Sequence, residues 1–538
     1  MNKEFLKRHS TPLVYDYFYE FDKVSEFFNG DFRSLIAYGL QADKILSRDL
    51  KRDAVTTALT EQNQKYGCGH KTLENISNLN RVDACAVVTG QQTGLFGGPL
   101  YTIYKVLTAV KLADYLNHNV KRCFVPIFWL ASDDHDFAEI NHIILLDKEN
   151  KVQKIHYKGH STALKMPVSK IMLTSEIDNC IQQLISTTPD SEFKQEILTD
   201  IKKVYQPGQS LVDAFARWMT RLFRSHGLII IDAGVPIFKK LGKRVFHKEI
   251  AGSSPSTQQA LRSSQRLKRL NYHPQIQLHR GKLNLFFAEK ERLTIENKSD
   301  GFVIKGTSDF YEKDEFLALA EKKPHFFSPN VLLRSIYQDT LLPTAAYVGG
   351  PSEIAYLAQM KNVYESFDLS MPVIYPRKTV TIIEKKIEKI MNNFGLNIPD
   401  IWNESTRPID KIIGTKIPES IDETLKAVSS HLEQDLKSLK KQITAFEPTL
   451  EKPVTTSMRR IDYQIQFMKK KILQASKKRN RILIRQLQKV KNNLYPDNHL
   501  QERTFNIVPF LIKYGYTFIE RLYREIDIED PGHQVIRL

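Results

Sequence analysis

A glycine-rich segment in the first quarter of the chain has the composition of an anion-binding loop. It reads TGQQTGLFGGPLYTIYK over residues 89–105, between an apolar run and an amphipathic stretch. A strand, a glycine loop and a helix in that order point backbone N–H groups and the positive helix end at a ligand. The segment therefore predicts a site for a phosphate or a carboxylate. Its candidate ligand-binding residues are Gly90, Gln91, Gln92, Thr93, Gly94, Gly97, Gly98 and Tyr101, and Lys105 is a candidate catalytic residue.

This loop matches neither of the familiar nucleotide-binding fingerprints. The Gly-Lys-Ser/Thr ending of a P-loop is missing from it, and its glycines are not spaced as Gly-x-Gly-x-x-Gly. A tight turn that is required only by packing is the alternative interpretation. The side chains of Gln91, Gln92 and Thr93 favour a ligand, because they supply donors and acceptors that a turn does not need.

An acidic cluster follows the second apolar run, in the sequence VPIFWLASDDHDFAEINH over residues 125–142. Ligands of open α/β sheets bind beyond the carboxyl ends of the strands, and carboxylates can orient an imidazole as an acid or a base. We expect His135, framed by Asp134 and Asp136, to accept a proton during catalysis, and Asp133 to contact the substrate. Magnesium binding, metal-dependent hydrolysis and a solvated turn are the alternatives.

A second Gly-Gly-Pro sequence occurs in TAAYVGGPSEIAY, residues 344–356. It repeats the logic of the first loop, since an apolar run ends at two glycines and a proline opens a helix. Two such helix starts suggest two ligand ends held by facing backbone amides, with arginines nearby as clamps for carboxylates or phosphates. Each arginine could instead be an ordinary ion-pairing residue. The candidate ligand-binding residues here are Arg334, Gly349, Gly350, Glu353, Tyr356 and Arg377.

The elements that must position these residues follow two patterns in the first part of the chain. Short apolar runs at 84–89, 123–131 and 228–232 alternate with helical patterns, which is typical of a parallel α/β sheet buried on both faces. Residues 271–306 instead alternate β-type residues with turn signals, which predicts a small antiparallel insertion. The predicted fold class is α/β, with a Rossmann-like core over residues 1–378.

Long helical patterns replace these from about residue 379. Between residues 454 and 475, apolar residues are spaced alternately four and three positions apart, which is the seam of a heptad repeat. A less regular apolar seam covers residues 425–446. Two prolines in residues 447–453 separate the seams, so they should fold into an antiparallel hairpin. We predict a coiled-coil domain over residues 379–500, and a C-terminal segment, 501–538, that packs back on the core.

The formal net charge of +17 is concentrated in one helical segment. Residues 455–495 carry twelve Lys or Arg and a single acid, whereas residues 417–447 carry six acids and four bases. A nucleic-acid-binding surface is one interpretation. A solvated helical face is favoured, because no RNA-binding motif or zinc finger accompanies the charge and the acidic arm can offset it across the hairpin or from a second subunit.

Composition excludes several other classes. No apolar run approaches the ~18 residues of a membrane span, and the start of the chain lacks the pattern of a signal peptide, so a cytoplasmic protein is expected. Cys68, Cys85, Cys123 and Cys180 form no Cys-x-x-Cys pair, which argues against a disulfide framework and a zinc ribbon. Metal binding by Cys68 with His70 is a minor alternative, and no metal site is predicted.

Five segments together carry a family likeness over nearly the whole chain. They are TGQQTGLFGGPLYTIYK, PIFWLASDDHDFAEINH, YVGGPSEIAYLAQMK, MPVIYPR and LQERTFNIVPFLIKYG. In this order they resemble the bacillithiol biosynthesis cysteine-adding enzymes, the BshC family. The resemblance implies a Rossmann-like core with connecting segments and a helical coiled-coil domain through which two subunits form a homodimer. It also implies a carbon–nitrogen ligase that joins the carboxyl group of L-cysteine to the amine of glucosaminyl malate, the last step of bacillithiol formation.

Amide formation adds a chemical requirement to this expectation, since the carboxyl group must be activated and the amine deprotonated. ATP or ADP with Mg²⁺ is the expected cosubstrate. We expect the N–H groups of Gly97, Gly98 and Gly349 to stabilise developing negative charge, and Arg334 or Arg377 to hold the malate carboxylates. The alternatives are a nucleotide-dependent ligase or nucleotidyltransferase for another small molecule, a basic coiled-coil protein that binds nucleic acid, and a scaffold.

Overall fold

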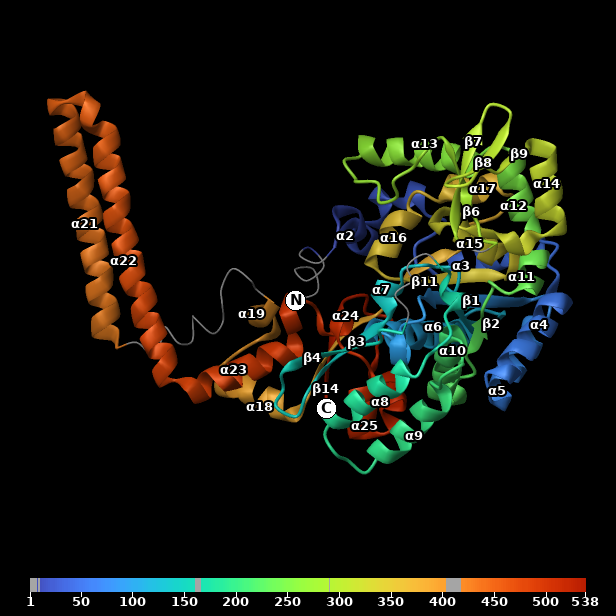
Figure 1. Ribbon diagram of the computed structural model, residues 1–538, viewed down its shortest axis with the longest axis horizontal. Coiled ribbons are helices and arrows are strands. Elements are labelled where there is room, and N and C mark those ends of the chain that lie inside the picture. Colours follow the sequence, from blue (N-terminus) through green and yellow to red (C-terminus); the bar gives the residue numbers. More distant parts are fainter. Residues whose placement is uncertain (1–6, 8–9, 160–165, 290, 403–417) are drawn as a thin grey trace. The chain divides into compact units, whose positions relative to one another are not determined.

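The computed structural model describes residues 7, 10–159, 166–289, 291–402 and 418–538 (Figure 1). The chain divides into two compact units. The first is formed by Met1–Thr381 with Glu502–Ile536, and the second by Ile382–Gln501 with Arg537–Leu538. Within the described residues, none of the helices combines the length and apolar character needed to cross a membrane.

A five-stranded parallel sheet forms the centre of the first unit. Its strand order is β12-β11-β1-β2-β5, and the strands are β1 (Ala84–Gln91), β2 (Cys123–Leu130), β5 (Ile229–Ile231), β11 (Thr344–Gly349) and β12 (Val373–Pro376). The strands are almost entirely buried, as expected for parallel strands covered by helices on both faces. The predicted α/β fold with a Rossmann-like parallel sheet is confirmed. Strand order reverses between β1 and β11, which is where such sheets bind ligands.

Helix α6 (Leu100–Asn119) follows β1 and packs on the sheet. Ile103, Val106, Leu107 and Val110 recur at helical spacing, and all four are buried against β1 and β2. Pro99 precedes the helix in an extended conformation, so the glycine segment makes a sharp connection between strand and helix. The strand, glycine loop and helix predicted from the sequence are therefore present.

The glycine loop itself is folded tightly around the C-terminal segment. Gly97 and Gly98 have φ angles of 98° and 70°, in the left-handed region that favours glycine. A Cβ on Gly94 would lie 2.8 Å from the Cα of Gly98, so the loop closes on itself without room for side chains. Asn506 Nδ2 donates to the carbonyl oxygens of Phe96 at 3.1 Å and Gly98 at 2.7 Å. Packing thus accounts for this part of the loop.

A second, antiparallel sheet is inserted between β5 and β11. Its strand order is β10-β6-β7-β8-β9, and its strands are β6 (Lys282–Phe287), β7 (Leu293–Lys298), β8 (Gly301–Ile304), β9 (Phe310–Glu312) and β10 (Phe327–Pro329). A second insertion, between β2 and β5, contains the antiparallel pair β3 (His142–Leu146) and β4 (Val152–His156). These are the connecting-segment insertions that the predicted fold class included.

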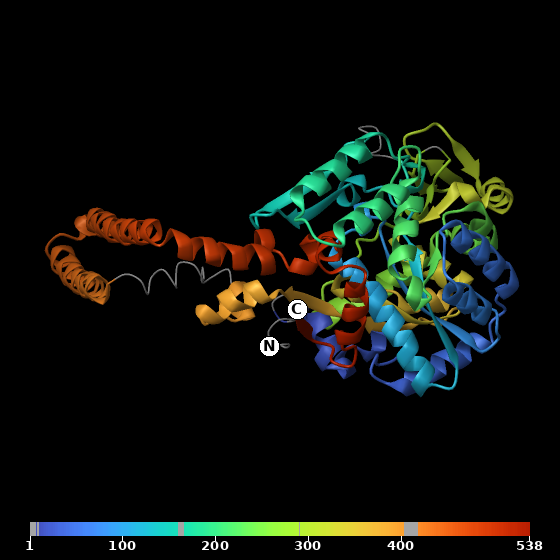
Figure 2. The same ribbon diagram turned by 90° about the horizontal axis from the view of Figure 1, so that it is seen from below.

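Helices surround the two larger sheets of this unit in both views (Figures 1 and 2). Before β1 come α2 (Pro12–Tyr19), α3 (Leu35–Leu46), α4 (Arg52–Lys65) and α5 (His70–Leu79). Between β2 and β5 lie α7 (Phe137–Ile140), α8 (Glu176–Thr187), α9 (Lys194–Val204) and α10 (Leu211–Leu222). Between β5 and β12 lie α11 (Pro236–Leu241), α12 (Lys243–Ala251), α13 (Pro255–Arg269), α14 (Lys313–Lys322), α15 (Val331–Leu341), α16 (Pro351–Leu357) and α17 (Lys361–Ser366).

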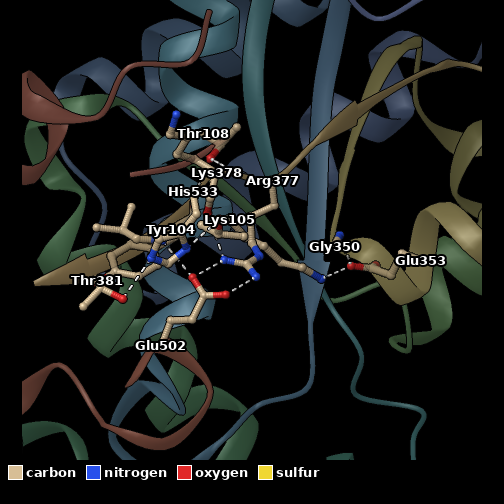
Figure 3. A network of polar contacts seen from close by, with 12 residues as sticks. Tyr104, Lys105, Thr108, Gly350, Glu353, Arg377, Lys378, Thr381, Glu502 and His533 are labelled. Carbon is tan, nitrogen blue, oxygen red and sulfur yellow. Dashed lines mark hydrogen bonds and ion pairs between the residues drawn. The ribbon is translucent and has the colours of Figure 1, made fainter. Parts of the chain in front are cut away.

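The C-terminal residues of the first unit are tied to the sheet by a buried ion pair. Glu502 Oε1 and Oε2 accept from Arg377 Nη2 at 2.7 Å and Nη1 at 3.0 Å, and Glu502 Oε2 also accepts from the N–H of Val380 (Figure 3). Burial alone would raise the pKa of Glu502, but Arg377 holds it below its ordinary value. The chain continues through α25 (Val508–Tyr514) and α26 (Thr517–Glu525).

The second unit contains a long helical hairpin. Helices α21 (Glu419–Phe446) and α22 (Glu451–Arg479) are joined by the short turn Pro448–Leu450 and lie side by side in both views (Figures 1 and 2). The predicted antiparallel coiled coil is confirmed. Residue 417, where the first arm was predicted to begin, lies outside the described residues. The other helices of this unit are α18 (Lys385–Asn393), α19 (Ile398–Trp402) and α23 (Arg481–Leu494). Strands β13 (Thr379–Ile383) and β14 (His533–Arg537) pair with each other, and most of their residues belong to the first unit.

The buried ion pair predicts a large loss of stability when one partner is neutralised. Glu502→Gln leaves the guanidinium of Arg377 buried without its counter-charge, and we expect the free energy of unfolding to fall by about 3 kcal/mol. Urea unfolding measures it. Asp213→Asn is the matched control, because the Asp213–Lys65 pair is partly exposed and its loss should leave the midpoint nearly unchanged. Equal effects of the two substitutions would contradict the prediction.

Candidate active site

A cavity of about 640 Å³ opens at the carboxyl ends of β1, β2 and β11, where the strand order reverses. Its wall combines the first glycine segment, the acidic cluster after β2, the start of α16 and one loop of the antiparallel insertion. Many of the residues predicted from the sequence meet here. Those that line the cavity are Gly90, Gln91, Gln92, Tyr101, Lys105, Asp133, Asp134, Arg334, Gly350, Glu353, Tyr356 and Arg377.

An ion pair between Lys105 and Glu353 joins the two sides of the cavity. The Nζ of Lys105 lies 2.5 Å from Glu353 Oε2, and it also donates to the carbonyl oxygen of Gly90 at 2.8 Å and to Gln91 Oε1 at 3.0 Å. Glu353 in turn accepts from the N–H of Gly350 at 2.8 Å (Figure 3). The pair therefore fixes the ends of β1 and β11 to one another.

Burial and pairing act in opposite directions on these two groups. Burial lowers the pKa of Lys105 below its ordinary value, although the charge of Glu353 opposes it. Burial alone would raise the pKa of Glu353, but Lys105 and the N–H of Gly350 bring it below its ordinary value. Pairing thus favours the charged form of both groups, and burial opposes it.

Arg334 lies beside this pair and keeps part of its hydrogen-bonding capacity. Its guanidinium carbon lies 5.2 Å from the ring centroid of Tyr347, and its Nη1 donates to Gln338 Oε1 at 3.0 Å. Its Nη2 is buried, and it has no hydrogen-bond partner among the residues that the structure describes. A guanidinium with an unused donor on a cavity wall is suited to a carboxylate or phosphate ligand.

Arg377 also lines the cavity, but its side chain is occupied. Both of its Nη atoms donate hydrogen bonds to the buried carboxylate of Glu502. A substrate carboxylate held by Arg377, as the sequence predicted in one alternative, would have to compete with Glu502. Arg503, which follows Glu502 in the sequence, adds a further cation to the lining and is itself exposed. The cavity wall near Lys105 is thus rich in positive charge.

The opposite part of the wall carries carboxylates. Asp134 Oδ2 accepts from Gln92 Nε2 at 2.6 Å, and Asp134 Oδ1 lies 3.8 Å from Nη1 of Arg292. Asp133 Oδ2 accepts from the buried Lys239 at 2.5 Å. Two consecutive residues at the end of β1 therefore contact the two parts of the cavity wall, since Gln91 contacts Lys105 and Gln92 contacts Asp134.

Asp232 lies behind this acidic part, at the end of β5. Its Oδ1 accepts hydrogen bonds from the hydroxyl of Ser132 and from the N–H of Gly234 at 3.0 Å. Burial raises the pKa of Asp232 to about 6, although these hydrogen bonds oppose the shift. Ser132 and Gly234 line the cavity, so they separate a carboxyl group that titrates near neutral pH from the ligand space.

The remaining predicted residues do not line the cavity. The N–H groups of Gly97 and Gly98 donate to the carbonyl oxygens of Gly94 and Leu95 in their own loop, and neither glycine lines the cavity. His135 Nδ1 lies 3.1 Å from Nη1 of Arg292, and Asp136 accepts from the N–H of Glu139 to cap α7. The predicted residues away from the wall are Thr93, Gly94, Gly97, Gly98, His135, Asp136 and Gly349.

The side chains that commonly bind metal ions are His, Cys, Asp and Glu. Among those residues, no group of three or more His, Cys, Asp or Glu side chains is arranged to hold a metal ion. Cys68 and His70 belong to no such group either. The lysine and arginine side chains that line the cavity are Lys105, Arg292, Arg334, Arg377 and Arg503.

Comparisons with known proteins decide the family. The model of the BshC N-terminal Rossmann-like domain of bacillithiol biosynthesis matches residues 1–378, and that of the BshC C-terminal coiled-coil domain matches residues 380–538. The chain belongs to the BshC family. Three similar relatives, each described as a candidate cysteine ligase, come from Salinibacter ruber, Solibacter usitatus and Chloroherpeton thalassium. They are 33%, 32% and 35% identical, over 97%, 98% and 93% of this chain and 96%, 97% and 91% of their own.

Membership of the BshC family favours the ligase interpretation over the nucleic-acid and scaffold alternatives, because both domains of the family are matched. Several cavity residues of this BshC chain were not predicted from the sequence. Arg292 comes from the loop between β6 and β7, where no motif marks it. Lys239 and Asp232 do not line the cavity themselves, but they contact the lining residues Asp133 and Ser132 from behind. Arg503 and Tyr347 lie within the family segments quoted above, and that position was the only signal for them.

The raised pKa of Asp232 predicts a pH-dependent effect of its neutralisation. Since the pKa rises from 3.8 to about 6, the stability of the wild-type protein should fall as the pH increases through this window. The Asp232→Asn variant has no carboxyl group at this position, so this pH-dependent loss of stability should be absent from it. Its stability relative to wild type should therefore improve by about 2 kcal/mol between pH 4.5 and pH 7.5. Urea unfolding at both pH values measures the difference, and a difference that is independent of pH would contradict the shift.

Proposed function

We propose that this BshC-family chain is a cysteine ligase, which joins the carboxyl group of L-cysteine to the amine of glucosaminyl malate and forms bacillithiol. The observation that carries the proposal is the cavity at the point where β1 and β11 diverge, with the unused Nη2 donor of Arg334 on its wall. Both substrates carry carboxylates, and fixed guanidinium groups recognise carboxylates through charge-assisted hydrogen bonds.

The distribution of charge supports a particular orientation of the acceptor. Malate contributes two carboxylates, and the cavity wall around Arg334 also includes Lys105 and Arg503. Arg377 is held by Glu502, so Arg334 is the better candidate for the malate carboxylates of the two arginines predicted from the sequence. The amine of the acceptor would then extend toward the carboxylates at the far side of the cavity.

Activation of the cysteine carboxyl group belongs to the same proposal, because a free carboxylate does not form an amide in water. We propose ATP with Mg²⁺ as the cosubstrate, and we assign none of the loops to its phosphates. The first glycine loop differs from that of class I ligases, and Gly97 and Gly98 use their N–H groups within the loop. Lysine and arginine side chains on the wall are the groups suited to phosphate charge.

We also propose that two copies associate through the helical hairpin, in the cytoplasm. Several residues of the predicted seams are exposed on the single chain, namely Val428, Leu439, Ile461 and Met468. Exposed apolar residues at heptad spacing are the usual surface for a second helical pair. The acidic residues of α21 could pair with the strongly basic α22 of a second copy.

Mass spectrometry of a reconstituted reaction tests the ligase proposal. Purified protein with L-cysteine, glucosaminyl malate, ATP and Mg²⁺ should give the condensed thiol, and omission of ATP should abolish it. Release of AMP or of ADP distinguishes an adenylate from an acyl phosphate. The control is the same protein shown to be folded by circular dichroism and dimeric by sedimentation velocity. No product from such protein under any nucleotide condition would contradict the proposal.

Substitution of Arg334 tests the orientation of the acceptor. Arg334→Gln removes a charge-assisted hydrogen bond, so the KM for glucosaminyl malate should rise about tenfold or more, with little change in the KM for cysteine. Arg334→Lys should recover part of the loss. The matched control is Arg81→Gln, which removes an exposed arginine far from the cavity lining. A tenfold rise in the KM for cysteine instead would reverse the assignment.

A further inference from the structure

The antiparallel insertion contributes one charged side chain to the cavity, and it is held in an unusual way. Arg292, on the loop between β6 and β7, has a side chain only 9% exposed. Its guanidinium carbon lies 4.0 Å from the ring centroid of Phe286, and its Nη2 donates to the carbonyl oxygen of Pro329 at 2.9 Å. The ring and the carbonyl fix the plane of the guanidinium, so its orientation is set before any ligand arrives.

The charge of Arg292 is incompletely matched by the protein. Its nearest recorded carboxylate oxygen is Asp134 Oδ1, at 3.8 Å from Nη1, which is too long for a hydrogen bond. Nη1 faces His135 Nδ1 at 3.1 Å, and Nε is buried without a hydrogen-bond partner among the described residues. A buried guanidinium normally has a carboxylate in direct contact, as Arg377 has in Glu502. Arg292 therefore retains capacity for an anionic ligand.

Asp134 is positioned to serve a different charge. One of its oxygens accepts from Gln92 and the other from the N–H of His135, so both oxygens are oriented by neutral donors. Its side chain is about one-third exposed, and both Asp134 and Asp133 line the cavity. The wall thus presents the guanidinium of Arg292 and the carboxylate of Asp134 side by side. Their closest atoms are 3.8 Å apart, so they do not hydrogen-bond to one another.

We infer that Arg292 and Asp134 form the subsite for the amino-acid donor, with Arg292 holding its α-carboxylate and Asp134 its α-ammonium group. This inference rests on the proposed ligase function and adds residues to it. An amino acid carries both charges on one carbon atom, which matches a cation and an anion whose closest atoms are 3.8 Å apart. Arg334 stays with the acceptor, so each substrate has an arginine of its own.

The inference also gives the antiparallel insertion a role. Arg292 and Phe286 both come from this insertion, while Asp134 and Gln92 come from the parallel core. The donor subsite is therefore complete only when the antiparallel insertion is packed against the parallel core. A residue that recognises the substrate is therefore supplied by a connecting segment, as is common when loops on a rigid scaffold determine specificity.

Calorimetric binding to four small thiols tests the subsite without turnover. The probes are L-cysteine, cysteamine, which lacks the carboxylate, L-cysteine methyl ester, and 3-mercaptopropionate, which lacks the amine. Wild-type protein should bind L-cysteine at least about tenfold more tightly than any of the others. Arg292→Gln should abolish the preference over cysteamine and leave cysteamine binding unchanged. Asp134→Asn should abolish the preference over 3-mercaptopropionate.

Arg81→Gln is the matched control, because it removes an exposed arginine that does not line the cavity and should leave all four affinities unchanged. Arg292→Lys and Phe286→Leu provide folded variants if Arg292→Gln fails to fold, and each should reduce the cysteine preference partly. Wild-type protein that does not distinguish L-cysteine from cysteamine, or a folded Arg292 variant that still does, would overturn the inference. Selective cysteine binding without ligation would contradict the proposed function alone.

Discussion

The buried ion pair between Lys105 and Glu353 is the constraint on which the cavity depends. Parallel strands β1 and β11 are neighbours in the sheet, yet the chain turns away from each of them in a different direction. Lys105 and Glu353 meet across this divergence and engage the carbonyl of Gly90 and the N–H of Gly350. Without the pair, the carbonyl of Gly90 and the N–H of Gly350 would lose these partners at a place that water reaches poorly.

A second connection closes the cavity from the C-terminal side. Glu502 holds Arg377 at the end of β12, and Asn506 holds the carbonyl oxygens of the glycine loop. Residues separated by several hundred positions thus define one wall. Arg503 reaches the cavity because its neighbour Glu502 is anchored, so the C-terminal segment contributes to the site as well as to the stability of the unit.

The sequence was sufficient for the elements, because local patterns dictate them. Continuous apolar runs predicted buried parallel strands, and the two Gly-Gly-Pro sequences predicted that helices start beyond β1 and β11. The same patterns could not separate a glycine that faces a ligand from one that packs. Gly90 and Gly350 line the cavity, whereas Gly97 and Gly98 wrap around Asn506, a residue far away in sequence. Arg292 was missed for the same reason, since only tertiary packing brings the loop between β6 and β7 to the strand ends.

The arginines of the cavity differ in a way that bears on what the site is for. Arg377 is paired by two hydrogen bonds with a carboxylate, and such a pair is a complete structural unit. Arg334 and Arg292 are also shielded from solvent, but each keeps a nitrogen that the described residues do not satisfy. Burial of such donors costs free energy, which the fold alone does not recover. In the proposed ligase, a substrate carboxylate would recover this cost, so the incomplete pairing would favour selection of an anionic substrate.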